Sequence, residues 1–255
     1  MPQKINFKEK FNKFAKYLGD ILFPRDVKCI FCGDELSNRE YNKTCELCYP
    51  ILPFITKSCP KCGGAVTEEN SGVCVDCKIN NYSFTMAMSV FEYIDQPLNA
   101  IHKLKYNRKK YLAKPLGTYL AQRLVTENIN IDYITFVPIH SSKLKERKFN
   151  QAQLLAKEVS NLLDIPCLPL CTKKINTPSQ TNLKFSERRA NVKDSFAFNI
   201  EHKNQIKGKN ILIIDDVFTT GATCNEVSSV ILKAGAKNCY VLTLAHVKVE
   251  PISSN

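Results

Sequence analysis

The sequence predicts an α/β domain built on a mainly parallel sheet, preceded by a cysteine-rich module. Over residues 85–246, β-prone apolar runs alternate with segments of helical periodicity, and this alternation places helices on the faces of a parallel sheet. Ahead of them, eight of the twelve cysteines occur as four Cys-x-x-Cys pairs. We therefore divide the 255 residues into an N-terminal helix over 1–22, a cysteine-rich module over 23–80 and the α/β domain over 81–248.

The elements of the α/β domain follow from local patterns. Runs of β-prone residues predict strands over 86–93, 133–139, 166–170, 210–215 and 238–244. Apolar residues at three- and four-residue spacing predict helices over 97–105, 111–127, 150–163 and 223–234. A basic turn is expected over 141–148, and residues 173–195 are polar and basic, with a weak helical piece at 186–190. Because ligands collect at the carboxyl ends of parallel strands, the basic turn and the acidic residues after strand 210–215 are expected near a ligand.

The N-terminal segment is lysine-rich and amphipathic. Residues 1–20 lack the uninterrupted apolar core of a secretory signal, and no apolar run in the chain has the length of a membrane span. Apolar residues at helical spacing favour a docking helix, with a membrane anchor as the alternative. We expect a cytoplasmic protein that does not insert into a membrane.

The cysteine pairs have the spacing of zinc ribbons, in which two knuckles supply four thiolates to one tetrahedral ion. The candidate metal ligands are Cys29, Cys32, Cys45, Cys48, Cys59, Cys62, Cys74 and Cys77. A disulfide scaffold would need an oxidising compartment, and a thioredoxin-like redox site would need one pair rather than four. Four thiolates leave no open coordination position, so the zinc is expected to be structural. Whether the pairs combine in sequence or interleave is left open.

The net charge of +12 is unevenly distributed. Residues 29–77 are net acidic, whereas residues 96–126 contain seven basic residues and no acid, and residues 173–193 contain six basic residues and one acid. Concentrated positive charge favours polyanions such as nucleic acid or a phosphorylated substrate; scattered lysines that aid solubility are the alternative. Because the ribbon is acidic, we expect it to serve folding and docking rather than to form the main nucleic-acid surface.

The segment 211–223 carries the most specific chemistry. A β-prone run leads into Asp215 and Asp216, followed by a small-residue loop and a helix. Thr223 and Glu226 form a Thr-x-x-Glu capping box, which predicts Thr223 as the N-cap. Helix N-termini bind phosphate, and paired carboxylates suit sugar hydroxyls or a phosphate-bound metal ion. The alternative is a buried strand with a polar turn, but carboxylates are rarely buried without partners.

This segment resembles the signature of the type I phosphoribosyltransferases, which bind 5-phosphoribosyl 1-pyrophosphate (PRPP). The resemblance implies that Asp215 and Asp216 contact the ribose hydroxyls and that Mg²⁺ accompanies PRPP. It assigns the 5-phosphate to a loop of five residues: Thr219, Thr220, Gly221, Ala222 and Thr223. Thr219 stands where transferases of 6-oxopurine salvage usually place a carboxylate, so that activity is not expected.

From about residue 20 to 246, the layout is similar to the ComF family, which is associated with DNA uptake in naturally competent bacteria. The matching residues are Leu104, Lys105, Tyr106, Val137, Pro138, Ile139, His140, Leu144, Arg147, Phe149, Asn150, Gln151, Thr177, Gln180, Leu183, Arg188, Asn191 and Phe196, together with the acidic pair and loop. Two positions depart from the family pattern: Ser141 stands where proline is common, and Lys148 stands where glycine is usual.

The resemblance implies roles for the basic blocks. Arg147 and Lys148 would lie near the pyrophosphate, and residues 173–195 would be a mobile loop that closes over the site. Arg188 is the candidate lid contact within that loop, and a solvated helix face is an equal alternative. For His140, a role as a structural hydrogen-bond donor is favoured over acid–base catalysis.

The favoured function is the handling of incoming single-stranded DNA by a protein with a PRPP site, and other competence proteins are candidate partners. The candidate nucleic-acid ligands are Lys103, Lys105, Arg108, Lys109 and Lys110, interleaved with Tyr106, Tyr111, Phe149 and Phe185. Core packing is the alternative for the aromatic residues and is favoured for Phe149. Other hypotheses are an active phosphoribosyltransferase with an unidentified acceptor and a regulatory homologue without catalysis.

Overall fold

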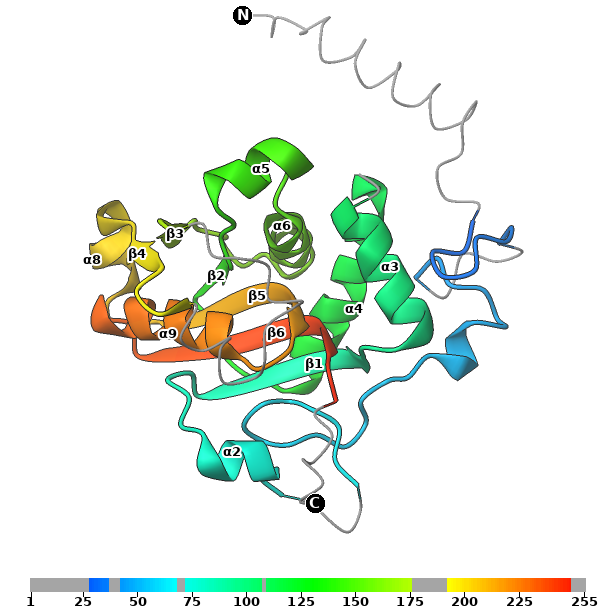
Figure 1. Cartoon of the computed structure of the whole chain (residues 1–255), viewed down its shortest axis with the longest axis horizontal. Coiled ribbons are helices and arrows are strands. Elements are labelled where there is room, and N and C mark those ends of the chain that lie inside the picture. The colour runs from blue at the N-terminus through cyan, green and yellow to red at the C-terminus, as the bar shows by residue number, and fades with distance from the viewer. Residues whose placement is uncertain (1–27, 37–41, 68–71, 107–108, 176–191, 249–255) are drawn as a thin grey trace, which may run out of the picture. The chain divides into compact units, whose positions relative to one another are not determined.

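The computed structural model describes residues 28–36, 42–67, 72–106, 109–175 and 192–248 (Figure 1). The chain divides into two compact units, Met1–Ile51 and Leu52–Asn255. The boundary between the units falls between the two cysteine quartets, so each quartet belongs to a different unit. The predicted helix over 1–22, as well as Arg108, Phe185 and Arg188, lies outside the described residues.

The first unit is organised by its cysteine knuckles. Gly33 N donates to Cys29 O at 3.0 Å, which closes the turn around the first pair, and Gly33 has a φ of 92°. Glycine adopts this left-handed conformation readily because it has no Cβ. The second pair leads into the 3₁₀ helix η1, Tyr49–Ile51.

The second unit contains a four-stranded sheet of β1 (Met86–Glu92), β6 (Asn238–His246), β5 (Asn210–Phe218) and β2 (Tyr133–Phe136), in this spatial order. Every neighbouring pair is parallel, which confirms the predicted α/β fold with a parallel sheet. The continuous apolar run 211–214 is fully buried, as expected for a strand covered on both faces.

Helices cover both faces of this sheet. The described helices of the second unit are α2 (Val75–Ile79), α3 (Asp95–Tyr106), α4 (Ala113–Thr126), α5 (Ser141–Arg147), α6 (Gln151–Leu163), α8 (Lys203–Ile206) and α9 (Ala222–Lys233), with the 3₁₀ helices η3 (Lys110–Leu112) and η5 (Ile200–His202). Helices α4 and α6 contact each other and the sheet. Val227 and Ile231 of α9 pack in one cluster with Ile211 and Ile213. This cluster includes three cysteines of the second quartet, so that ribbon shares the core of the α/β domain.

Two predicted elements were wrong. The basic turn expected over 141–148 forms helix α5, because His140 accepts a hydrogen bond from Ser142 N and caps its start. The strand expected over 166–170 forms only an isolated bridge at Cys167, because Pro166 and Pro169 have no N–H to donate to a ladder. The chain instead forms β3 (Cys171–Lys173), antiparallel to β4 (Phe196–Phe198), and this hairpin was not predicted.

Candidate functional site

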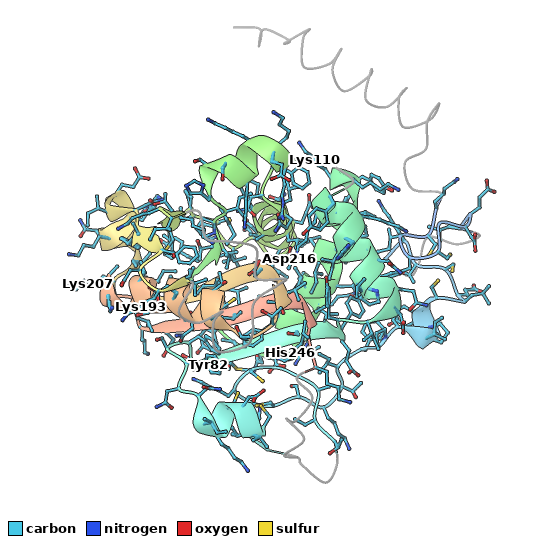
Figure 2. All side chains as sticks on the ribbon, viewed as in Figure 1. Tyr82, Lys110, Lys193, Lys207, Asp216 and His246 are labelled. Carbon is cyan, nitrogen blue, oxygen red and sulfur yellow. The ribbon has the colours of Figure 1, made fainter. Side chains whose placement is uncertain are left out.

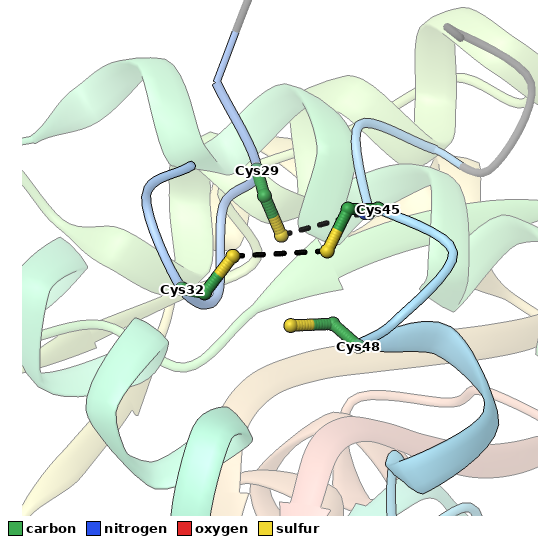
Figure 3. A group of neighbouring side chains, drawn as sticks. All are labelled: Cys29, Cys32, Cys45 and Cys48. Atoms are coloured by element: carbon green, nitrogen blue, oxygen red, sulfur yellow. Dashed lines mark hydrogen bonds between the residues drawn. The ribbon is translucent and has the colours of Figure 1, made fainter. Parts of the chain in front are cut away.

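Both cysteine quartets have the geometry of a four-thiolate metal centre. Within each quartet all four Sγ atoms lie within 4.8 Å of one another, and Figure 3 shows the first quartet converging on a common point. The Sγ atoms of Cys32 and Cys45 are 3.7 Å apart, as are those of Cys62 and Cys74. A tetrahedron with zinc–sulfur bonds of about 2.3 Å has edges of about 3.8 Å, so the donor set fits zinc.

In each quartet, a backbone N–H group lies close to one of the four sulfur atoms. Cys45 N lies 3.5 Å from Cys29 Sγ, and Cys74 N lies 3.4 Å from Cys59 Sγ. Such N–H groups stabilise thiolate charge and orient the metal ligands. The two quartets therefore fit structural zinc, each combining consecutive pairs, and the question of interleaved pairing is resolved in favour of sequential pairing.

The acidic pair lies at the carboxyl edge of the sheet, although β5 continues beyond it. The ladder between β5 and β2 ends at Ile214, whereas the ladder with β6 continues to Phe218. Because successive side chains of a strand point to opposite faces, the carboxylates of Asp215 and Asp216 diverge. Asp215 Oδ1 accepts a hydrogen bond from Asp216 N at 2.9 Å.

Asp216 is buried and ion-paired. Lys105 Nζ, from α3, lies 3.0 Å from Asp216 Oδ2. Asp216 is labelled in Figure 2. Burial lowers the pKa of Lys105, but the opposite charge of Asp216 outweighs it, and the pKa of Lys105 is raised overall. Lys105 is therefore charged at neutral pH. Lys105, expected to contact nucleic acid, lies instead beside the acidic pair.

Asp215 titrates near neutrality. Burial, followed by the neighbouring charge of Asp216, raises the pKa of Asp215 to about 7, while Lys105 and Lys173 oppose the shift. Burial and the charge of Lys143 lower the pKa of Lys173 to about 8. Strongly shifted pKa values cluster at functional sites, which marks this edge of the sheet as a candidate site.

The loop 219–223 turns through Gly221 into α9. Gly221 has a φ of 69° and is the N-cap of α9, and Thr220 Oγ1 accepts a hydrogen bond from Ala222 N at 3.3 Å. The prediction that Thr223 is the N-cap was wrong, because the left-handed turn at Gly221 starts the helix at Ala222. Glu226, its expected capping partner, instead accepts a hydrogen bond from Asp194 N through Oε1 at 2.9 Å.

The residues expected near pyrophosphate lie at the end of α5. The Arg147 guanidinium lies over the Tyr106 ring, 5.0 Å from its centroid, and Nη1 lies 3.4 Å from Gln151 Oε1. Lys148 has a φ of 66°, the conformation that a glycine at this position would adopt readily. Arg147 thus connects α5 to the exposed aromatic end of α3.

The remaining expected nucleic-acid ligands lie at the surface or partly buried. Lys110 is exposed, with Nζ 5.1 Å from the centroid of the buried Phe149 ring, while Lys103 and Lys109 are partly buried. The core position favoured for Phe149 is confirmed. His140 was expected to be a structural donor, but its Nδ1 accepts a hydrogen bond from Ser142 N and caps α5.

Sequence reasoning missed the ion pair of Lys105 and the contribution of Tyr82. A usable signal existed for Lys105: it follows Ile101 by four residues on α3, and Ile101 is fully buried. Residues four apart share a helix face, so Lys105 is directed inward. No such spacing pattern around Tyr82 predicts its contact with the loop. Its hydroxyl donates to Thr220 O at 3.1 Å.

Comparison with known proteins identifies the family. The model of the Double zinc ribbon domain matches residues 18–78. Competence protein F of Haemophilus influenzae is 30% identical over 228 residues, which cover 86% of this chain and 97% of that protein. The chain belongs to the ComF family. DNA utilization protein YhgH of Escherichia coli K12 is 27% identical over 206 residues, or 78% of this chain and 88% of that relative.

Among solved structures, purine phosphoribosyltransferase from Pyrococcus horikoshii is 20% identical, with a TM-score of 0.34, over 55% of this chain and 78% of that chain. The ComF family chain therefore combines a double zinc ribbon with a parallel α/β domain. Within the described residues, no helix has both the length and the hydropathy needed to cross a membrane.

We expect two zinc ions per chain, one for each quartet. Cys32→Ser and Cys74→Ser should each remove one ion, because each breaks a separate centre. Native mass spectrometry measures the stoichiometry, and Cys167→Ser, outside both quartets, is the control. Loss of both ions from either single substitution would contradict two separate centres.

The raised pKa of the half-buried Asp215 carboxyl should make stability depend on pH. Its folded pKa of about 7 lies above the unfolded value of about 4, so the folded state holds this proton more tightly. Its contribution to stability is therefore lost as pH rises from about 4 to about 7. Asp215→Asn should raise Tm relative to wild type by an amount that grows over this range and then levels off. A difference in Tm that does not change with pH would refute the assignment.

Proposed function

We propose that this ComF-family protein acts in natural competence, where it handles incoming single-stranded DNA in the cytoplasm and binds PRPP in its α/β domain. The observation that carries the PRPP site is the acidic pair at the carboxyl edge of β5, followed by a loop that enters the N-terminus of α9. Open parallel sheets bind ligands at this edge, and a helix N-terminus offers free N–H groups and a positive dipole to phosphate.

Each part of PRPP has a candidate set of ligands. Asp215 and Asp216 suit the ribose hydroxyls, and the loop 219–223 suits the 5-phosphate. Arg147 and Lys148 are proposed for the pyrophosphate, with Arg188 as a lid contact. The carboxylate oxygens also suit Mg²⁺, which would neutralise phosphate charge when bound with PRPP. Lys105 holds the carboxylate of Asp216 in place through their ion pair, and carboxylate oxygens accept hydrogen bonds from hydroxyls.

A basic and aromatic surface supports the DNA-handling function. Tyr106 and Tyr111 are 54% and 57% exposed, and Arg147 and Lys110 lie beside aromatic rings. Exposed rings stack on bases of any sequence, and neighbouring cations bind the backbone, as single-strand binding requires. The names Competence protein F and DNA utilization protein, carried by two relatives, support the same context.

The second candidate function is an active phosphoribosyltransferase with an unidentified acceptor. It is favoured by the titration of Asp215 near neutrality, which suits a group that changes protonation during a reaction. Thr219 continues to argue against a 6-oxopurine acceptor. A regulatory role for a PRPP pocket without turnover fits the same residues.

Calorimetric titration with PRPP and Mg²⁺ tests the pocket. Wild type should bind, and Asp216→Asn should weaken binding at least tenfold, because it removes the negative charge beside Lys105. Asp164→Asn, at the end of α6, is a matched control and should bind like wild type. Absence of binding by wild type would refute the PRPP site; release of pyrophosphate during the titration would favour the transferase.

Fluorescence anisotropy with a labelled oligothymidylate tests the DNA surface. Tyr106→Ala should weaken binding by about 1–3 kcal/mol through lost stacking, whereas Tyr106→Phe retains the ring and should bind nearly like wild type. Affinity should fall steeply with salt because phosphate contacts release counterions. Binding by Tyr106→Ala equal to wild type would exclude this surface, and transformation frequency of the same variants connects it to competence.

A further inference from the structure

The second zinc ribbon packs directly on the sheet that carries the candidate PRPP site. Its first knuckle ends at Gly63, where an added Cβ would lie 2.5 Å from Ala87 O of β1. Ala87 N donates to Lys61 O at 2.8 Å, between two knuckle cysteines. Only glycine permits this approach, so the knuckle and β1 form one packed unit.

The same knuckle holds the segment that leaves the ribbon. Lys61 Nζ donates to Phe84 O, and it lies 3.2 Å from Thr85 O. Phe84 is fully buried, and its ring stacks on Tyr82 at 4.8 Å between centroids. Tyr82 is thereby fixed by a residue that the ribbon itself contacts.

Tyr82 in turn contacts the proposed phosphate loop. Its hydroxyl donates to Thr220 O at 3.1 Å, and Thr220 is 2% exposed. A Cβ added at Gly221 would lie 3.0 Å from Tyr82 Cε1, so the ring also packs against the left-handed turn that starts α9. The next residue, Ser83, donates its N–H to Asn225 Oδ1 at 2.6 Å. Two consecutive residues therefore bind the loop and the first turns of α9.

A second route reaches the loop through His246. The imidazole of His246 stacks on Phe218, with 4.9 Å between centroids and 14° between planes. A Cβ at Gly64 would lie 2.6 Å from Cε1 of His246, which is labelled in Figure 2, so the ribbon packs against the imidazole of this stack. Phe218 is the last residue of β5 and precedes the loop. Groups that contact the second ribbon therefore pack against both ends of the loop 219–223.

We propose that Tyr82 is a positioning residue for the phosphate loop and that the second zinc ribbon is a structural part of the PRPP pocket. Four thiolates bound to one ion cross-link the two knuckles, and a ribbon without its metal loses that cross-link. Loss of metal from this ribbon then frees Tyr82 and the His246–Phe218 stack, and the loop loses its fixed conformation. This inference rests on the proposed binding of PRPP, but the order of the loop can be measured without PRPP.

The first experiment compares Tyr82→Phe with wild type and with Tyr240→Phe. Tyr82→Phe keeps the ring but leaves Thr220 O without its donor, whereas Tyr240 lies at the opposite end of the sheet, paired with Met86. Hydrogen–deuterium exchange over residues 219–223 should accelerate only in Tyr82→Phe, and affinity for PRPP should fall about three- to tenfold, the equivalent of one lost hydrogen bond. Exchange and affinity like those of wild type would overturn the role of Tyr82.

The second experiment removes one thiolate from the second ribbon with Cys74→Ser. Exchange over residues 219–223 should accelerate, while exchange of the buried strand segment 211–214 reports whether the domain stays folded. Unchanged loop exchange with one ion lost would overturn the proposed link between ribbon and loop. If 211–214 also exchanges faster, the domain has unfolded and Tyr82→Phe decides the question. If wild type does not bind PRPP, the proposed function fails while the exchange data still test the link.

Discussion

The ion pair between Lys105 and Asp216 is the interaction on which the candidate site most depends. It joins α3 to β5 with charges that are largely removed from water. Removing one partner of such a pair leaves an uncompensated buried charge, at a cost of about 3–5 kcal/mol. The pair therefore fixes how α3 lies against the carboxyl edge of the sheet. The charge of Lys105 also opposes the burial that raises the pKa of the neighbouring Asp215 to about 7.

The same helix connects the proposed pocket to the proposed DNA surface. Lys105 is directed toward Asp216, and the next residue, Tyr106, is exposed and lies under Arg147. Arg147 belongs to α5, whose C-terminal end is the candidate pyrophosphate region. A ligand that moves α5 would therefore change the stacking surface as well.

The two ribbons have the same ligand chemistry but different surroundings. The first belongs to a small unit of its own, whereas the second shares a hydrophobic core with the sheet. A metal centre within a larger core stabilises its own knuckles and also the strands and helices that pack against them, because those elements depend on the shape of the ribbon. The acidic charge of the ribbon region and the absence of an open coordination position agree with structural roles for both metal ions.

Features encoded in short segments could be predicted from the sequence. The eight zinc ligands, the parallel α/β alternation, and the acidic pair followed by a small-residue loop and a helix all depend on spacing within a few tens of residues. Two predictions also failed for local reasons. The N-cap of α9 is not Thr223, because the left-handed turn at Gly221 starts the helix earlier, and two prolines prevent the short strand predicted over 166–170. In each case the residue responsible, a glycine or a proline, is visible in the sequence, but whether it decides the local structure depends on the surrounding packing.

Only the tertiary structure decided which distant groups meet. Tyr82 and Thr220 are separated by 138 residues, and no periodicity connects them. The partner of Lys105, the assignment of the two ribbons to different units and the backing of the loop by His246 are likewise products of packing. The sequence by itself determined which chemical groups this protein carries, because residue type and spacing define zinc ligands and strand ends. The fold decided which of them act together, because burial and pairing between distant segments exist only once the chain has folded.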